Sequence, residues 1–475
     1  MGNIGVVMDH NESNLTLGVI VGNREFFPDE QAVEGGRRII RILEEEGFEV
    51  VTPFNEETGE GTAEDREDSK KYSELFKEKR DEIDAVLVTL PNFGDEKSLA
   101  EIFKLSELDV PVMVHAFPDE TGKMDRAHRR DSFCGKLSVC NNLNQYGIPF
   151  TNTREHVEDP DSGIFREDLT FLGRISRTVN RLKKARLGVI GVRPNPFQTV
   201  RYSEKILEEQ GISVENISLI EIIERSRRID EEEPIFQEQL DQLKNQFALG
   251  NIPHEAVLKT AKLFGTVLEW AGTNDLDAIS LQCWPAMEKY YEIAPCGAMS
   301  MLTEKLLPSA CESDVMGSLS MYALQLASGN PPALIDINNN YGDCSDKFVA
   351  FHCSNFPKSF FGEEKCELGY HEMQEVYGAC SGRVAPGPAT FLRISTNDRE
   401  GGVRTYVAEG EFTDDELETF GGYGVVKIEY LPSLLEHIVN EGFEHHTAVI
   451  RGHVADILEE AFDRYLGWEV YRHNP

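Results

Sequence analysis

The sequence predicts an α/β protein in which two doubly wound, Rossmann-like parallel-sheet domains precede a mixed α+β domain with an antiparallel or barrel-like sheet. The first third alternates short apolar runs with helical patterns, and a second series of the same kind begins near residue 184. After Pro332 the strand signals come closer together and helical patterns become fewer. A β-α-β rhythm is typical of parallel sheets covered by helices, whereas closely spaced strands favour antiparallel pairing.

The first domain, expected over residues 1–183, has four apolar runs that are typical of strands. Segments with apolar residues at helical spacing separate them, for example Glu30–Glu46 and Glu96–Ser106. Strands joined in this way form a parallel sheet with right-handed crossovers and helices on both faces. The runs are Leu15–Gly22, Phe48–Pro53, Ala85–Leu90 and Val110–Phe117.

The second domain, expected over residues 184–331, repeats this rhythm. Its strand candidates are ARLGVIG, VENISLI and LDAISLQC. A helical stretch over Ser313–Ala327 ends at Ser328–Pro332, where a glycine and two prolines form a strong stop signal.

The third domain, expected over residues 332–475, has six closely spaced strand candidates and two helical patterns, Leu431–Asn440 and Val454–Tyr465. The strand candidates are ALIDIN, KFVAFHC, ATFLRIST, VRTYVAEG, GVVKIEYL and HTAVIRG.

The charge balance excludes some partners. The 475 residues include 83 Asp and Glu against 47 Lys and Arg, which gives a formal net charge of −36. A field of this sign repels phosphate backbones, so we expect neither nucleic acid nor an anionic membrane as a partner. A salt-adapted host is one explanation of so acidic a surface.

The cysteines and the apolar runs indicate the compartment. The nine cysteines are an odd number and none forms a C-x-x-C motif, which argues against a structural zinc site or a disulfide framework and fits a reducing compartment. The N-terminus lacks the features of a secretory signal, and no apolar run is long enough to span a membrane. We therefore expect a cytoplasmic protein.

Two carboxylates and a histidine are the strongest candidates for chemistry. Glu312 and Asp336 lie 24 residues apart, and the doublet His445-His446 follows near the C-terminus. Supplied from separate elements, such groups would form an open divalent-metal site, and the carboxylates would exchange protons with a substrate. A structural alternative also exists, because Ser309 and Glu312 have the S-x-x-E spacing of a helix capping box.

The sequence around these residues resembles the L-fucose isomerase and L-arabinose isomerase family. The strings ACESDVMG, PALIDINNNYGD, AFHCSNFP and EGFEHHTAVIRGHV carry the resemblance, and the 24-residue interval and the spacing of His446 to Gly452 are those of the fucose isomerase branch. The strings VGNREFFPDE, PNFGDE and DSFCGKLSVCNN are similar to the first domain of that superfamily. QCWPAMEKYYEIAPCGAMS is similar to its second domain.

The resemblance implies a metal-dependent aldose–ketose isomerase that acts on a free monosaccharide. It implies that Glu312, Asp336 and His446 bind one divalent cation, usually Mn²⁺ with Mg²⁺ or Co²⁺ as alternatives, and that Glu312 and Asp336 are the acid–base pair. Pentoses, 6-deoxyhexoses and a modified hexose such as sulfoquinovose are the candidate substrates. It also implies a homo-oligomer, a trimer or hexamer, in which a neighbouring subunit completes the pocket. Arg24 and Asn92-Phe93 are the candidates for serving a neighbour's pocket in this way.

Further side chains are candidates for binding the sugar. Gln282 and Asn339 would hydrogen-bond its hydroxyl groups, and Trp284 or Phe93 would stack on its apolar face, although core packing is an equal explanation for Trp284. An anionic sugar would pair with a basic side chain. The candidates for this pairing are Arg24, Arg193 and His352, of which Arg193 also fits a surface position and His352 a structural one.

Two other classes of protein compete with this hypothesis. A non-catalytic cytosolic sugar-binding or sensor protein with the same fold would not need Glu312, Asp336 and His446 together. A nucleotide-dependent α/β enzyme is disfavoured, because neither G-x-x-x-x-G-K-[ST] nor a strand-linked G-x-G-x-x-G occurs.

Overall fold

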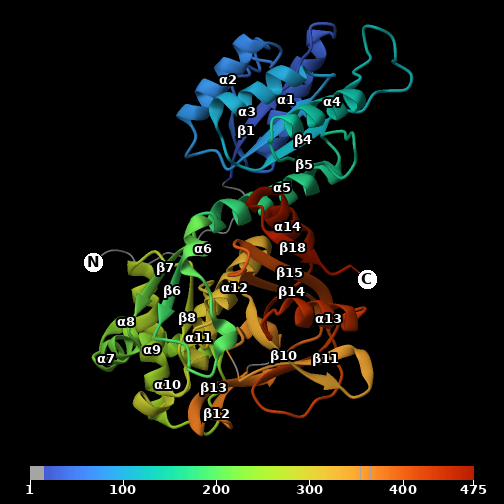
Figure 1. Ribbon diagram of the computed structural model, residues 1–475. Coiled ribbons are helices and arrows are strands. Elements are labelled where there is room, and N and C mark those ends of the chain that lie inside the picture. The colour runs from blue at the N-terminus through green and yellow to red at the C-terminus, as the bar shows by residue number, and fades with distance from the viewer. Residues whose placement is uncertain (1–14, 354, 363–365, 475) are drawn as a thin grey trace. The chain divides into compact units, whose positions relative to one another are not determined.

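The computed structural model describes residues 15–353, 355–362 and 366–474, which form two compact units (Figure 1). The N-terminal unit contains the described residues up to Asn180 together with 460–467, and the larger unit contains those of 181–459 and 468–474. None of the described helices combines the length and the apolar character that a membrane span needs.

The N-terminal unit is built on a five-stranded parallel sheet with the strand order β2-β1-β3-β4-β5. All six residues of β1 and of β3 are buried, as expected of central strands covered on both faces. The strands are β1 (Thr16–Val21), β2 (Glu49–Val51), β3 (Ala85–Leu90), β4 (Val112–Ala116) and β5 (Thr151–Asn152).

Helices cover both faces of this sheet, which confirms the predicted doubly wound architecture. One apolar cluster joins the sheet to α2, α3 and α4, and a second joins its other face to α1 and α5. The helices are α1 (Asp29–Glu45), α2 (Arg66–Glu78), α3 (Glu96–Ser106), α4 (Ser132–Gln145) and α5 (Gly163–Leu182).

A short piece of the C-terminal chain also belongs to the N-terminal unit. The segment η4 (Glu460–Leu466) continues the helix α14 (Ala455–Glu459), where the sequence predicted a single helix over Val454–Tyr465. The Tyr465 hydroxyl donates to the Val112 carbonyl at 3.0 Å, and the Thr151 hydroxyl donates to the Glu460 carboxylate at 2.7 Å. These bonds attach the segment to the β4–β5 edge of the sheet.

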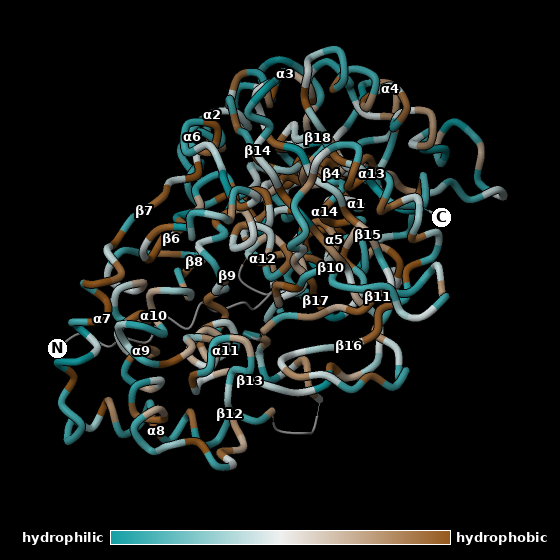
Figure 2. Tube along the Cα trace, turned by 60° about the horizontal axis from the view of Figure 1, so that its bottom comes forward, coloured by the Kyte–Doolittle hydropathy of each residue, from teal (hydrophilic) through white to brown (hydrophobic). Residues whose placement is uncertain are grey.

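The larger unit begins with a four-stranded parallel sheet of order β7-β6-β8-β9, as the second β-α-β series predicted. Figure 2 shows apolar and hydrophilic residues alternating along surface helices of this unit such as α7 and α8. The strands are β6 (Arg186–Ile190), β7 (Ser213–Ile217), β8 (Ala278–Leu281) and β9 (Ser309–Cys311). The helices are η2 (Gln198–Val200), α6 (Glu204–Glu209), α7 (Leu219–Arg227), α8 (Pro234–Gln246), α9 (His254–Thr273), α10 (Ala286–Tyr290), α11 (Cys296–Glu304) and α12 (Val315–Ser328).

A nine-stranded mixed sheet follows, of order β12-β13-β16-β11-β10-β17-β14-β15-β18. An additional pairing of β15 with β16 closes six of these strands into a ring, so the barrel-like sheet is confirmed. The strands are β10 (Ala333–Tyr341), β11 (Cys344–His352), β12 (Glu367–His371), β13 (Val376–Arg383), β14 (Gly387–Thr396), β15 (Val403–Phe412), β16 (Gly422–Lys427), β17 (His446–Arg451) and β18 (Glu469–Arg472). The helical elements are η3 (Lys358–Phe361), α13 (Leu431–Glu441) and α14.

Helix α12 links the two sheets of the larger unit (Figure 1). Every residue from Val315 to Ala327 is buried, and the helix packs against β8 on one side and against β14 and β17 on the other. One apolar core runs through both sheets as a result. The predicted division into residues 1–183, 184–331 and 332–475 stays a prediction, since the contacts divide the chain into two units.

Candidate active site

Glu312 lies in a strained turn between β9 and α12. Glu312 and Ser313 have φ angles of +62° and +57°, a left-handed conformation that costs non-glycine residues on the order of 1–3 kcal/mol each. The capping-box interpretation of Glu312 is wrong, because Ser309 lies in strand β9 and the helix begins at Val315. The capping residue is Asp314, whose carboxylate accepts from the N–H of Gly317 at 2.9 Å.

Three predicted site residues lie close together beside this turn, namely Glu312, Asp336 and His446. Asp336 on β10 and His446 on β17 are direct antiparallel partners. Nε2 of His446 lies 3.1 Å from Oε2 of Glu312 and 3.5 Å from Oδ1 of Asp336. The other Glu312 oxygen, Oε1, accepts from the indole N–H of Trp284 at 2.7 Å, which fixes the direction of the carboxylate.

A buried ion-pair network behind His446 was not foreseen from the sequence. Nδ1 of His446 lies 2.9 Å from Oδ2 of Asp314, and Arg393 donates two hydrogen bonds to the same carboxylate at 2.6 and 3.0 Å. Arg393 also donates to Glu444 at 3.1 Å, and both Arg393 and Asp314 are completely buried. Two features of the sequence could have indicated this network: the string ESD at Glu312–Asp314, and a lone arginine in the apolar run ATFLRIST.

This network sets the tautomer of His446. An ionised Asp314 only accepts hydrogen bonds, so Nδ1 of His446 must carry a proton, and Nε2 is the nitrogen that faces Glu312 and Asp336. Histidines that bind metals are held in this way, by a carboxylate on the second ring nitrogen.

The electrostatics of the cluster favour a positive charge at its centre. Burial opposes a charged imidazole, but hydrogen bonds to Asp314 and Glu312 outweigh it and raise the pKa of His446 to about 10. Burial likewise opposes ionisation of Glu312 and Asp314. The hydrogen bond with His446 nevertheless lowers the pKa of Glu312, and Arg393 holds the pKa of Asp314 well below its usual range. The cluster therefore holds two ionised carboxylates close to one imidazole.

The donor atoms fit a divalent cation. Oδ1 of Asp336 and Nε2 of the neighbouring His352 are buried and have no hydrogen-bond partner among the described residues, and Oε2 of Glu312 lies 3.1 Å from Nε2 of His446. Glu312, His352 and His446 offer ligand atoms within 4.8 Å of one another, and so do Asp336, His445 and His446. Carboxylate oxygens and imidazole nitrogens suit Mn²⁺, Mg²⁺ or Co²⁺ better than a thiophilic ion.

A cleft of about 540 Å³ opens above the cluster, which is enough for a monosaccharide. Among its described lining residues the only basic side chains are His352 and His445. Burial opposes the charge of His352, but Cys353, Asp336 and Glu312 raise its pKa to about 9. The lining residues are Phe197, Glu312, Asp336, Asn338, Asn339, Val349, Phe351, His352, Cys353, Met373, Leu417, Glu418, Thr419, Phe420 and His445.

The predicted sugar-binding residues have different surroundings. Asn339 and His352 line the cleft, and Trp284 supports it through Glu312 and through an edge contact with Phe197 at 5.7 Å. Gln282 is buried, and its Oε1 accepts from the N–H of Val192 at 3.1 Å. That bond braces the loop after β6, and the predicted contact of Gln282 with the sugar stays a prediction.

Arg24 and Phe93 lie in the N-terminal unit. The guanidinium of Arg24 covers the Phe93 ring at 4.4 Å and pairs with Glu96 at 3.3 Å. Their predicted role in a neighbour's pocket stays a prediction. Arg193 donates to the carbonyls of Pro194 and Asn195 and is not among the cleft residues.

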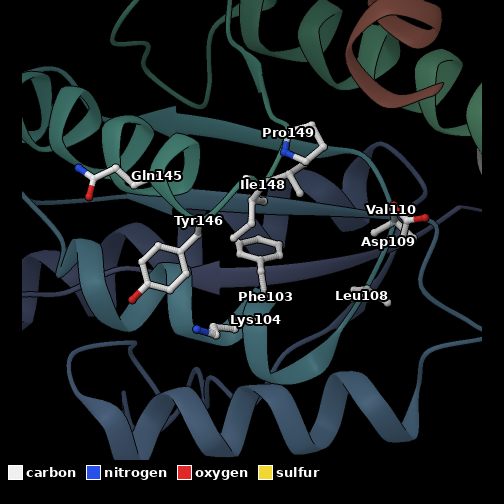
Figure 3. Close-up of a pocket in the computed structure, with 11 residues that line it drawn as sticks. Phe103, Lys104, Leu108, Asp109, Val110, Gln145, Tyr146, Ile148 and Pro149 are labelled. Atoms are coloured by element: carbon white, nitrogen blue, oxygen red, sulfur yellow. The ribbon is translucent and has the colours of Figure 1, made fainter. Parts of the chain in front are cut away.

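A second hollow of about 470 Å³ lies in the N-terminal unit, where α3 and α4 end (Figure 3). Phe103, Tyr146 and Ile148 supply its apolar lining, and the Lys104 ammonium lies 5.5 Å from the Tyr146 ring. It contains none of the predicted site residues.

Comparison with known protein families gives two matches along the chain. Residues 18–183 match the family described as fucose/sulfoquinovose isomerase, N-terminal domain, and residues 350–474 match L-fucose isomerase, C-terminal domain. Together the matches cover more than half of the chain. They include His446 but neither Glu312 nor Asp336.

Curated relatives match across most of the chain. A protein named sulfoquinovose isomerase from Priestia aryabhattai is 27% identical over 387 residues, which are 80% of this chain and 84% of the relative. A protein of the same name from Alkalicoccus urumqiensis is 26% identical over 383 residues, 79% of this chain and 83% of the relative.

Proposed function

The chain belongs to the fucose isomerase-like branch of the sugar ketol isomerases, and on that premise we propose that it interconverts sulfoquinovose and the corresponding ketose. The reaction site is the cleft above Glu312, Asp336 and His446, and these residues hold one divalent cation, Mn²⁺ in the first place. The approach of Glu312 and Asp336 to the same nitrogen of His446 carries the proposal of a metal-dependent reaction. The names of the curated relatives support the choice of sugar.

The cation would polarise the sugar carbonyl and stabilise the negative charge that develops on the substrate oxygens. The protein contributes a fixed donor set. Asp314 keeps the proton of His446 on Nδ1, and Trp284 keeps Oε1 of Glu312 engaged, so that Nε2 and Oε2 face the centre of the cluster.

Glu312 and Asp336 supply the acid–base chemistry. One carboxylate removes the proton from carbon while its partner serves the hydroxyl group, and each positioned transfer is worth roughly 10²–10⁴-fold in rate. The strained backbone at Glu312 is consistent with this role, because such conformations persist where a side chain must be held in a particular direction.

Charge is relevant to the choice of a sulfonated sugar. The described lining of the cleft offers His352 and His445 as its only basic groups, against Glu312, Asp336 and Glu418. We therefore propose that a neighbouring subunit of a homo-oligomer supplies Arg24 to pair with the sulfonate and Phe93 to stack on the sugar. The non-catalytic sensor gains no support, since the relatives are named as isomerases.

The test is an assay of chelator-treated protein before and after addition of Mn²⁺, with sulfoquinovose, L-fucose and L-arabinose as substrates. We expect no turnover without metal, restored turnover with Mn²⁺, and a preference for sulfoquinovose. In deuterated water the product should gain deuterium at C1 or C2. Full activity in the metal-stripped protein would refute the metal site, whereas a preference for L-fucose would refute only the choice of sugar.

A further inference from the structure

The fold gathers cysteines that the sequence keeps apart. Six of the nine cysteines lie in the interior of the larger unit, five of them buried and Cys353 partly so. The sulfur atoms of Cys283 and Cys311 are 3.3 Å apart, and those of Cys366 and Cys380 are 2.8 Å apart. Cys353 is a lining residue of the cleft and the other five are not, and none of the six has a role in the proposed isomerisation.

One group within this set has the composition of a metal site. Cys296 at the start of α11, Cys353 after β11 and His371 at the end of β12 offer ligand atoms that all lie within 4.8 Å of one another. Cys296 and His371 are 1% and 2% exposed, so both side chains are shielded from bulk water.

The imidazole of His371 is incompletely satisfied. Its Nδ1 accepts from the N–H of Gln374 at 3.2 Å, while its Nε2 is buried and has no hydrogen-bond partner among the described residues. An unsatisfied buried polar group is unfavourable, and a bound cation would give Nε2 a partner. Oε1 of Glu288 is a second buried atom without a described partner, and burial, opposed by the charge of His371, raises the pKa of Glu288 to about 7.

We propose that Cys296, Cys353 and His371 bind a thiophilic divalent cation of the zinc class, at a site separate from the one formed by Glu312, Asp336 and His446. Two thiolates and one imidazole suit zinc in tetrahedral coordination, whereas the oxygen-rich cluster suits manganese. Three protein ligands leave a fourth position for water or for the Glu288 carboxylate.

Loading this site requires proton movements that balance. Each thiol that binds as a thiolate releases one proton, so up to two protons leave. Binding through Nε2 of His371 moves the ring proton to Nδ1, and the hydrogen bond from Gln374 must then break. The loss of one neutral hydrogen bond is small beside the binding free energy of a structural zinc site.

The location gives the site a consequence for the cleft. Cys353 is itself a cleft residue, and Met373, two residues after His371, is another. A cation bound to Cys353 and His371 would connect these two parts of the cleft wall to α11. We therefore expect zinc to raise the thermal unfolding temperature of the protein.

Co²⁺ is the probe, because cobalt thiolate bonds have a characteristic near-ultraviolet charge-transfer absorption. The full-length protein, reduced and first saturated with Mn²⁺, is titrated with Co²⁺. We expect a thiolate band and strong visible absorption that saturate at one equivalent and disappear when Zn²⁺ is added. Absence of the band in protein whose thiols are confirmed as reduced would overturn the proposal.

Variants assign the ligands. Cys353→Ser and Cys296→Ser should each abolish or strongly reduce the band. His371→Gln should weaken Co²⁺ binding by more than the roughly 10–100-fold that loss of an outer-sphere partner costs. Cys344→Ser, at an exposed cysteine outside the group, is the matched control and should leave the titration unchanged.

A band that survives in both Cys353→Ser and Cys296→Ser would place the cobalt elsewhere and refute the assignment. Glu312→Gln separates the two proposals, because it should remove isomerase activity and keep the cobalt band. Circular dichroism of each variant confirms that it is folded.

Discussion

Asp336 and His446 face each other directly across strands β10 and β17, with Oδ1 of the carboxylate 3.5 Å from Nε2 of the imidazole. The register of two antiparallel strands thus brings together residues from distant parts of the chain. A shift of one residue would turn one side chain to the opposite face of the sheet and dismantle the cluster. The buried network behind His446 and the turn at Glu312 complete the arrangement.

Replacement of Glu312 by glutamine should remove activity without unfolding the protein. The amide oxygen still accepts from Trp284, but the group loses its charge and its basicity, so we expect kcat to fall by roughly 10²–10⁴-fold. Glu436→Gln is the matched control, because Glu436 is exposed on α13 and is not a lining residue of the cleft. An unchanged kcat in Glu312→Gln would show that Glu312 has no catalytic role.

Removal of the negative charge of Asp314 should weaken metal binding although Asp314 is not a proposed ligand. Asp314→Asn loosens the hold on His446, so we expect Mn²⁺ affinity to fall about 10–100-fold, measured by calorimetric titration. Glu444 would also be the only one of the two carboxylates to stay ionised beside Arg393, which predicts a loss of about 3–5 kcal/mol in unfolding free energy. Asp415→Asn, at a surface ion pair, should change neither quantity appreciably. Wild-type Mn²⁺ affinity in Asp314→Asn would contradict the positioning role.

The hydrogen bond from Trp284 to Glu312 gives a graded prediction. Trp284→Phe removes the donor and keeps an aromatic ring near Phe197. A hydrogen bond to a charged acceptor contributes about 1.5–3 kcal/mol, so a tenfold to hundredfold fall in kcat/KM is expected. If steady-state kinetics of the folded variant match the wild type, the indole has no part in orienting Glu312.

The metal-stripped protein should lose stability as pH rises from about 6.5 to about 10. Burial opposes the charge of His446, but Asp314 and Glu312 raise its pKa to about 10 from an ordinary value of 6.5. A raised pKa contributes stability that is fully present below pH 6.5 and is lost as pH rises through about 10. Thermal unfolding temperatures across this range measure the effect, and His446→Gln should flatten the difference. Saturation with Mn²⁺ should flatten it as well, because the cation replaces the proton.

The fold class was predictable because it depends on local patterns. Buried parallel strands such as Ala85–Leu90 are continuous apolar runs, and α12 ends at Ser328 with Gly329 as its C-cap, where the sequence predicted the stop. The capping-box interpretation of Glu312 failed because Ser309 pairs with Ile279 in the parallel sheet, and this tertiary pairing overrides a local helix signal. The pairing of β15 with β16 closes the ring of strands, and no local sequence pattern predicts that these two strands are in contact.

The sequence by itself determined that the chain alternates strands and helices and that Glu312, Asp336 and His446 carry a recognisable spacing. Only the tertiary structure decided that Arg393 and Asp314 brace His446, that Gln282 braces a loop, and that Cys296, Cys353 and His371 meet. Periodicity and spacing are properties of residues that are close in sequence, so they can be read from the sequence itself. Buried ion pairs and ligand clusters depend on which distant strands align, and strand register is fixed when the whole core packs.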